Sequence, residues 1–176
     1  MKRIVVLIVS IALLGLVGCA ASEQGGEVTR RGASEAVLGT FAATDMDGNA
    51  VDESILSGKK VTMINLWAPW CGPCVGEMPD LQKLNEKYAD KGFQVIGVID
   101  EADLNNADET IKDTGVKYPV LKLGDSSSAL YQAVIGHPEF QNAIPFSFFV
   151  DENGKQIGQA YTGAYDWEPI VEELLK

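Results

Sequence analysis

A strand, helix, strand order at the centre of the chain constrains the fold more than any other feature. Residues 61–66 and 93–99 are almost continuously apolar, and between them Leu81, Leu84 and Tyr88 recur at helical spacing. Strands that are apolar on both faces belong to sheets covered on both sides. The pattern therefore predicts a βαβ unit within a covered α/β sheet.

The rest of the chain predicts further elements of the same domain, without an internal repeat or a second break in composition. The pair Asp47-Gly48 is typical of a hairpin turn and predicts a hairpin within residues 41–51. We expect helices at 104–114, 127–135 and 167–175, a strand at 119–123, and an antiparallel hairpin of 147–150 with 156–161. These elements form one α/β domain over residues 37–176.

The N-terminus reads as a targeting segment. Lys2 and Arg3 precede an apolar run over residues 4–17, which is short for a transmembrane helix and typical of a signal peptide. The following Leu16-Val-Gly-Cys19 resembles the bacterial lipobox, in which the cysteine is lipidated and becomes the mature N-terminus. An ordinary secretory signal with an incidental cysteine is the alternative.

The lipoprotein interpretation divides the chain into a signal peptide at 1–18, a lipidated flexible tether at 19–36 and the folded domain at 37–176. It places the protein in the bacterial cell envelope, outside the cytoplasm and anchored to a membrane by lipid. The tether is small and polar without apolar periodicity.

The charge balance narrows the range of partners. The chain has 14 Lys+Arg against 25 Asp+Glu, a formal charge of -11 at pH 7, and removal of Lys2 and Arg3 with the signal would lower it to -13. Sequence-independent binding to nucleic acid needs clustered cations and is excluded. Such an acidic domain is repelled by anionic lipid, so its attachment should come from acyl chains.

The candidate redox site is Cys71-Gly-Pro-Cys74, which lies between the end of the strand at 61–66 and the start of the helix that follows it. A bare C-x-x-C also occurs in zinc sites, but its place at a strand-to-helix junction favours redox chemistry. The first helical turn would bring the sulfurs together, and the positive helix end would lower the pKa of Cys71 by stabilising its thiolate. Cys71 is thus the predicted nucleophile, and the more buried Cys74 the resolving thiol.

Residues 65–79, NLWAPWCGPCVGEMP, resemble the active-site segment of the thioredoxin superfamily. Within it they resemble the extracytoplasmic, membrane-tethered branch that includes the TlpA-like and ResA-like thiol-disulfide oxidoreductases. The resemblance extends over residues 37–176. It implies a thioredoxin fold with a mixed central sheet flanked by helices, an added N-terminal β-hairpin and an insertion after the first βαβ unit. It also implies a redox-active Cys71–Cys74 disulfide and no metal or other cofactor.

The resemblance assigns further site residues. In Ala143-Ile-Pro-Phe146, Pro145 matches a cis-proline that faces the disulfide, where its neighbour's backbone pairs with the substrate peptide. The substrate groove is expected to comprise Trp70, Gly72, Pro73, Ile144 and Phe146, whereas Trp67 fits either the groove or the core.

One departure concerns the carboxylate beneath the active site. Cytoplasmic thioredoxins carry a buried Asp where this chain has Asn65. ResA-like proteins place a Glu near the site, which we assign to the loop after the next strand. That loop holds Asp100, Glu101 and Asp103, of which Glu101 is the provisional choice, although plain surface positions explain all three equally well.

His137 is the only histidine. A copper site of Cys71, Cys74 and His137 would resemble Sco-like relatives, but those have three residues between their cysteines. We therefore expect no metal and an exposed loop histidine. A peroxidatic role is disfavoured because Ala68 stands where peroxiredoxin-like proteins carry Thr three residues before the reactive cysteine.

The dipeptide between the cysteines bears on redox direction. Reducing thioredoxins carry Gly-Pro there and have reduction potentials of about -270 mV, whereas the reduction potential of the oxidant DsbA is about -120 mV. The expected activity is therefore a protein-disulfide reductase. A thiol oxidase or isomerase, or a non-catalytic metal- or partner-binding module, are the alternatives.

The resemblance also implies partners. A CcdA- or DsbD-like membrane protein would supply electrons. The substrates would be disulfide-containing exported proteins, among them apocytochrome c thiols in cytochrome c biogenesis, or a surface methionine sulfoxide reductase with an antioxidant role. We expect a monomer.

Overall fold

The structure, a computed structural model, describes residues 37–176. The predicted signal peptide, the tether and the lipidation of Cys19 lie outside these residues and stay predictions. The elements in chain order are β1 (Ala42–Asp45), β2 (Ala50–Asp52), η1 (Glu53–Leu56), β3 (Val61–Trp67), α1 (Gly72–Tyr88), η2 (Ala89–Lys91), β4 (Phe93–Ile99), η3 (Glu101–Asp103), α2 (Ala107–Thr114), β5 (Val120–Lys122), α3 (Ala129–Val134), β6 (Phe146–Val150), β7 (Gln156–Thr162) and α4 (Glu168–Leu174).

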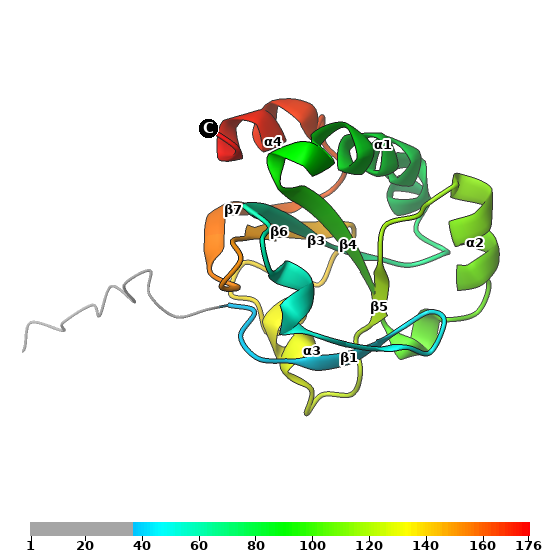
Figure 1. The fold of residues 1–176 in the computed structure, drawn as a ribbon. Helices are drawn as coiled ribbons and strands as arrows, with labels where there is room; N and C mark the ends of the chain where they lie inside the picture. Colours follow the sequence, from blue (N-terminus) through cyan, green and yellow to red (C-terminus); the bar gives the residue numbers. More distant parts are fainter. Residues whose placement is uncertain (1–36) are drawn as a thin grey trace, which may run out of the picture. The chain divides into compact units, whose positions relative to one another are not determined.

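The strands form one mixed sheet in the order β2-β1-β5-β4-β3-β6-β7 (Figure 1). Strands β3, β4 and β5 are parallel, and β6, β7, β1 and β2 join the sheet antiparallel. Because β3 and β4 lie in the middle, every residue of both strands is buried. The predicted βαβ unit and both hairpins are thus present.

Alternation along the central strands divides the core into two clusters. Met63 and Val95 face the side covered by α1 and α4, where Leu81 and Val171 are buried. Ile64 packs on the opposite side with residues of α3. Figure 1 shows α1 and α4 on one side of the sheet and α3 on the other. The site described below belongs mainly to the first side.

Helix α4 is held against the C-terminal end of α1 by polar contacts. The Tyr88 hydroxyl lies 2.7 Å from Glu172 Oε1 and 3.0 Å from Glu168 Oε1, so its one hydrogen bonds to one of these carboxylates or is shared between them, and Lys87 pairs with Glu168. The acceptor Glu172 and burial together raise the pKa of Tyr88 to about 12. Through these contacts α4 presents Trp167, the residue that precedes it, to the buried face of α1.

The helix predicted to begin at residue 104 begins at Ala107 instead. The turn of η3 comes first, and Asn106 has a left-handed backbone with φ of 64°, which interrupts helical geometry before α2. No helix within residues 37–176 is both long and apolar enough to cross a membrane.

Candidate functional site

Cys71 and Cys74 form a disulfide at the N-terminus of α1, with their Cα atoms 5.2 Å apart. Cys71 is the N-cap residue, and its Sγ accepts a hydrogen bond from the Cys74 backbone N–H at 3.3 Å. Cys71 is 5% exposed and Cys74 fully buried, as expected for an attacking and a resolving sulfur. In the reduced state, the same N–H and the positive helix end would favour a thiolate on Cys71.

A buried carboxylate lies one helical turn beyond Cys74. Glu77 is 6% exposed and accepts two hydrogen bonds, from Asn65 Nδ2 at 3.0 Å and from Trp167 Nε1 at 2.8 Å. Asn65 Nδ2 also donates to Ser147 Oγ at 2.9 Å. Burial raises the pKa of Glu77, and the two donors offset part of that rise.

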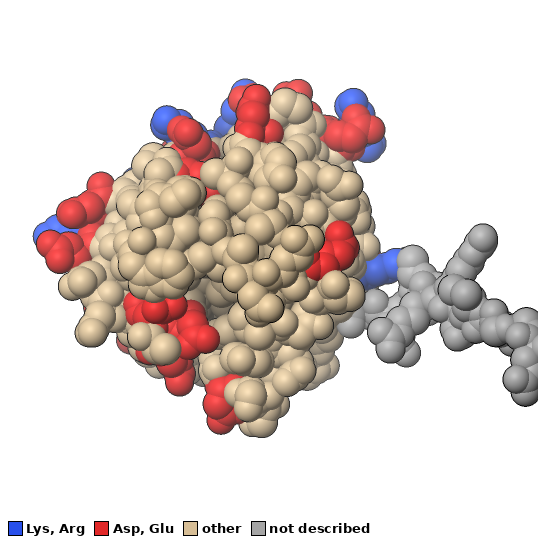
Figure 2. Space-filling model, turned by 180° about the vertical axis from the view of Figure 1, so that it is seen from behind, with Lys and Arg blue, Asp and Glu red and all other residues tan. Residues whose placement is uncertain are grey.

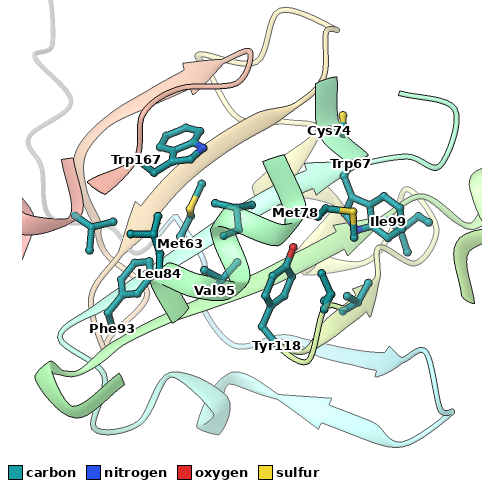
Figure 3. Packing of buried hydrophobic residues seen from close by; sticks show 14 of the residues in the cluster. Met63, Trp67, Cys74, Met78, Leu84, Phe93, Val95, Ile99, Tyr118 and Trp167 are labelled. Atoms are coloured by element: carbon teal, nitrogen blue, oxygen red, sulfur yellow. The ribbon is translucent and has the colours of Figure 1, made fainter. Parts of the chain in front are cut away.

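Three buried polar atoms on this side of the molecule have no hydrogen-bond partner within residues 37–176. They are Asn65 Oδ1, Trp67 Nε1 and the Tyr118 hydroxyl. Burial and the nearby Glu77 charge raise the pKa of Tyr118. Figure 3 shows Tyr118 reaching from the chain before β5 into the cluster that also holds Trp67, Met78 and Cys74. The carboxylate therefore sits in a buried, partly polar environment next to the disulfide.

Pro145 lies at the same end of the strands as the disulfide, where β3 ends and β6 begins. The register pairs Leu66 of β3 with Phe146 of β6, so Pro145 comes where β3 leaves the sheet toward Cys71. The Ile144–Pro145 peptide bond is cis, which is the geometry that the resemblance implies. Neither backbone polar group of Ile144 is hydrogen bonded within residues 37–176. This backbone can therefore pair with another chain.

A cavity of about 410 Å³ opens between Trp70 and the chain before Pro145. Its lining is mostly apolar and includes Leu66, Trp67, Trp70, Ile135, Phe140, Asn142, Ala143 and Ile144, with Asp100 and Asp103 as its acidic members. Trp70 is 70% exposed, and its Nε1 donates to Asp103 Oδ1 at 2.7 Å. Glu101, the provisional choice from sequence, is exposed and does not line this cavity.

Two expectations for the groove and its surroundings were wrong. Phe146 was expected in the groove but is 1% exposed, because alternation along β6 turns it into the core on the α3 side. His137 was expected to be exposed but is 4% exposed, packed against the Phe148 ring at 4.8 Å with Nε2 on Gln156 Oε1 at 3.1 Å. Gly72, Pro73 and Ile144 remain accessible, and Trp67 belongs to the core.

The structure brings no set of three His, Cys, Asp or Glu side chains together as metal ligands anywhere in residues 37–176. His137 contacts Gln156 and the rings of Phe146 and Phe148. Burial lowers the pKa of its imidazole. The Glu139 N–H donates to Nδ1 at 3.1 Å, an arrangement that suits the neutral ring.

The mixed sheet, the disulfide at the start of α1 and the cis-proline before β6 define a protein of the thioredoxin fold. A solved structure of a thiol:disulfide interchange protein from Chlorobium tepidum TLS superposes with a TM-score of 0.67 at 27% identity, covering 79% of this chain and 95% of that one. Residues 33–175 match the Redoxin family model, and the chain belongs to this family.

Within the superfamily the chain is TlpA/ResA-like. It is 32% identical over 138 residues to the thiol-disulfide oxidoreductase ResA of Bacillus thuringiensis subsp. konkukian, covering 77% of this chain and 73% of that protein. It is also 32% identical over 121 residues to ResA of Bacillus thuringiensis strain Al Hakam, where the match spans 68% of this chain and only 64% of that protein's length. StoA of Bacillus subtilis, at 21% identity and a TM-score of 0.59, supports the fold alone.

Glu77 is the site residue that sequence reasoning missed. A signal was present, since Glu77 follows Cys74 by three positions and precedes the buried Leu81 by four, which places it on the inward face of α1. A charged residue at such a position is rarely buried without partners. Its partners, Asn65 and Trp167, come from distant parts of the sequence.

Proposed function

We propose that this protein is an extracytoplasmic thiol-disulfide oxidoreductase that reduces disulfides of exported proteins through the Cys71–Cys74 pair. The observation that carries the proposal is the disulfide at the start of α1, with Cys71 as the N-cap and Cys74 buried behind it. Relatives named thiol-disulfide oxidoreductase support the reaction type.

In the proposed reaction the Cys71 thiolate attacks one sulfur of a substrate disulfide. A mixed disulfide forms and one substrate thiolate leaves. Cys74, after losing its proton, attacks Cys71 Sγ, which restores the Cys71–Cys74 disulfide and releases the second substrate thiolate. Two electrons pass to the substrate, and each released thiolate takes up a proton.

We propose that Glu77 accepts the Cys74 proton in the second step. It is a buried carboxylate one turn from Cys74 on the same face of α1, and burial raises its pKa, which makes it a better proton acceptor than an exposed carboxylate. Ile144 would hold the substrate backbone beside the disulfide, since its own backbone groups are unpaired within residues 37–176.

The cellular setting is part of the proposal. Residues 1–18 read as a lipoprotein signal peptide followed by Cys19, whose lipidation would anchor the domain outside the cytoplasm. A reductase in an oxidising compartment needs electrons from across the membrane, so a CcdA- or DsbD-like protein is the proposed donor. Apocytochrome c, a surface methionine sulfoxide reductase and other exported proteins are the candidate substrates.

Insulin reduction by the wild-type protein and by Cys71→Ser tests the activity. The wild-type protein should accelerate precipitation of the insulin B chain and Cys71→Ser should not. Equal rates for the two proteins would contradict the proposal and favour a non-catalytic binding module.

Cys74→Ser offers a second test in living cells. This variant should retain substrates as mixed disulfides on Cys71, because the resolving thiol is absent. The double variant Cys71→Ser with Cys74→Ser is the matched control and should retain none. Failure to trap any protein while Cys71 still reacts with a thiol reagent would contradict the proposal for exported substrates.

A further inference from the structure

The cavity beside Trp70 adjoins the reacting groups without containing them. Two of its lining residues, Trp70 and Ile144, are the chain neighbours of Cys71 and Pro145. A peptide held at Ile144 with its cysteine joined to Cys71 would therefore pass the mouth of this cavity. A side chain that flanks the peptide's cysteine is the group best placed to enter it.

The lining of the cavity is mostly apolar, and its two acidic residues come from one short segment of the chain. Ile135, Phe140 and Ile144 supply apolar surface, whereas Asp100 and Asp103 come from the turn that contains η3. No Lys or Arg is among the lining residues. This combination fits a side chain with an aliphatic stem and a cationic head, because the stem can pack on apolar surface while the charge meets the carboxylates.

Both carboxylates are held in place through one oxygen only. Asp100 Oδ1 accepts from the Ala102 N–H at 2.9 Å, and Asp103 Oδ1 accepts from Trp70 Nε1 at 2.7 Å. The second oxygen of each makes no hydrogen bond within residues 37–176. Each carboxylate is thus oriented by a hydrogen bond from within the protein, and its second oxygen remains available to a ligand.

The negative charge of the wider surface also favours cationic ligands. Figure 2 shows acidic side chains in several patches on one face of the molecule, with Lys and Arg only along its margin. The chain as a whole has a formal charge of -11. Such a field attracts cationic peptides at long range, but it does not select which residue enters the cavity.

We infer that this cavity is a specificity subsite for a Lys or Arg side chain next to the target cysteine of the substrate. The inference rests on the proposed function and names the substrate class it would favour, which is disulfides in basic sequence surroundings. The cationic head lies between Asp100 and Asp103, and the stem packs on Phe140 and Ile144.

The test uses the reduced protein as a stoichiometric reductant of symmetric disulfide dimers of Ala-X-Cys-X-Ala, with X as Lys, norleucine or Glu. Each dimer yields two thiols as Cys71 and Cys74 become a disulfide. We expect the second-order rate constant for the Lys dimer to exceed that for the Glu dimer by about tenfold at low salt, the size expected for two partly exposed charge pairs. Norleucine retains the stem without the charge and should fall between them.

The decisive variant is Asp100→Asn with Asp103→Asn, because Asn at 103 still offers an oxygen to Trp70. It should lower the Lys rate to the norleucine rate. Asp90→Asn with Glu152→Gln is the matched control. It removes the same charge from exposed positions outside the cavity and should retain the full Lys preference.

Several results would overturn the inference. They are an unchanged Lys-to-Glu ratio in the Asp100 and Asp103 variant, an equal loss in the control variant, which would indicate the general field, and a norleucine dimer that reacts fastest. If insulin is reduced while the three dimers react alike, only the subsite is refuted. If neither insulin nor any dimer is reduced, the proposed function fails and the subsite with it.

Discussion

Replacing Trp167 with Phe tests whether Glu77 is an ionising carboxylate held by buried donors. Trp167 Nε1 donates to Glu77 Oε2 at 2.8 Å, and both side chains are buried. The substitution keeps an aromatic ring and removes the donor. A hydrogen bond to a charged group contributes about 1.5–3 kcal/mol, and one to a neutral group about 0.5–1.5 kcal/mol. The loss should therefore depend on the ionisation of Glu77.

The direction of the pH dependence follows from burial. Burial raises the pKa of folded Glu77 above its ordinary value of 4.5. The contribution of Glu77 to the free energy of unfolding is therefore fully present below pH 4.5 and is lost as the pH rises through the folded pKa. In Trp167→Phe the loss should be larger, because the ionised carboxylate has one donor fewer. Between pH 5 and pH 9 the destabilisation should grow by about 1–1.5 kcal/mol.

Urea unfolding of the oxidised protein at both pH values measures this difference, since an intact disulfide removes thiol titration from the comparison. Trp70→Phe is the matched control, because it removes the same indole N–H from an exposed contact with Asp103. It should change the free energy of unfolding by less than about 0.5 kcal/mol at either pH. An equal destabilisation of Trp167→Phe at pH 5 and pH 9 would refute the reasoning.

The remaining predictions concern backbone geometry and the buried histidine. Gly154→Ala should lower the free energy of unfolding by more than about 1 kcal/mol, because Gly154 has a φ of 71° and a Cβ there would lie 1.6 Å from the Leu38 carbonyl oxygen. Gly48→Ala, at a φ of 87° with open space around it, should cost less in the same denaturant titration. Burial lowers the pKa of His137, so its contribution is present above its ordinary value of 6.5 and is lost as the pH falls toward the folded pKa. His137→Gln should flatten that part of the stability profile, and an unchanged slope below pH 6.5 would show that the imidazole does not titrate differently in the fold.

The central fold could be predicted because its signals are local. The strands at 61–66 and 93–99 are apolar on both faces, and the structure places them within one residue of those bounds in the middle of the sheet. The cysteine pair was predictable for the same reason, since its place between a strand and a helix is visible in the sequence. The start of α2 was less so, because it depends on the left-handed backbone of Asn106.

The parts that could not be predicted depend on long-range contacts. Glu77 is buried because Asn65 and Trp167 converge on it, and Trp167 is 90 positions away in the sequence. His137 looks like a loop residue beside Pro138, yet Phe148 and Gln156 from a later hairpin cover it. The burial of such polar residues becomes apparent only in the folded structure, because the residues that cover them are distant in the sequence.

The cavity lined by Asp100 and Asp103 likewise becomes visible only in the tertiary structure. Asp100 and Asp103 first drew attention as possible catalytic carboxylates, but in the structure they line a cavity together with Phe140 and Ile144. The buried carboxylate comes instead from α1. The two acidic features thus have separate proposed roles, proton transfer within the protein for Glu77 and recognition of the substrate for Asp100 and Asp103.

The reduction potential of the Cys71–Cys74 couple tests the central claim most directly. It is measured by equilibrating the protein with glutathione or dithiothreitol buffers and quantifying the fraction of disulfide. A Gly-Pro dipeptide between the cysteines predicts a reduction potential of about -270 mV, in the range of reducing thioredoxins. A value above about -180 mV, in the range of isomerases and oxidants, would contradict the reductase and favour an oxidase or isomerase.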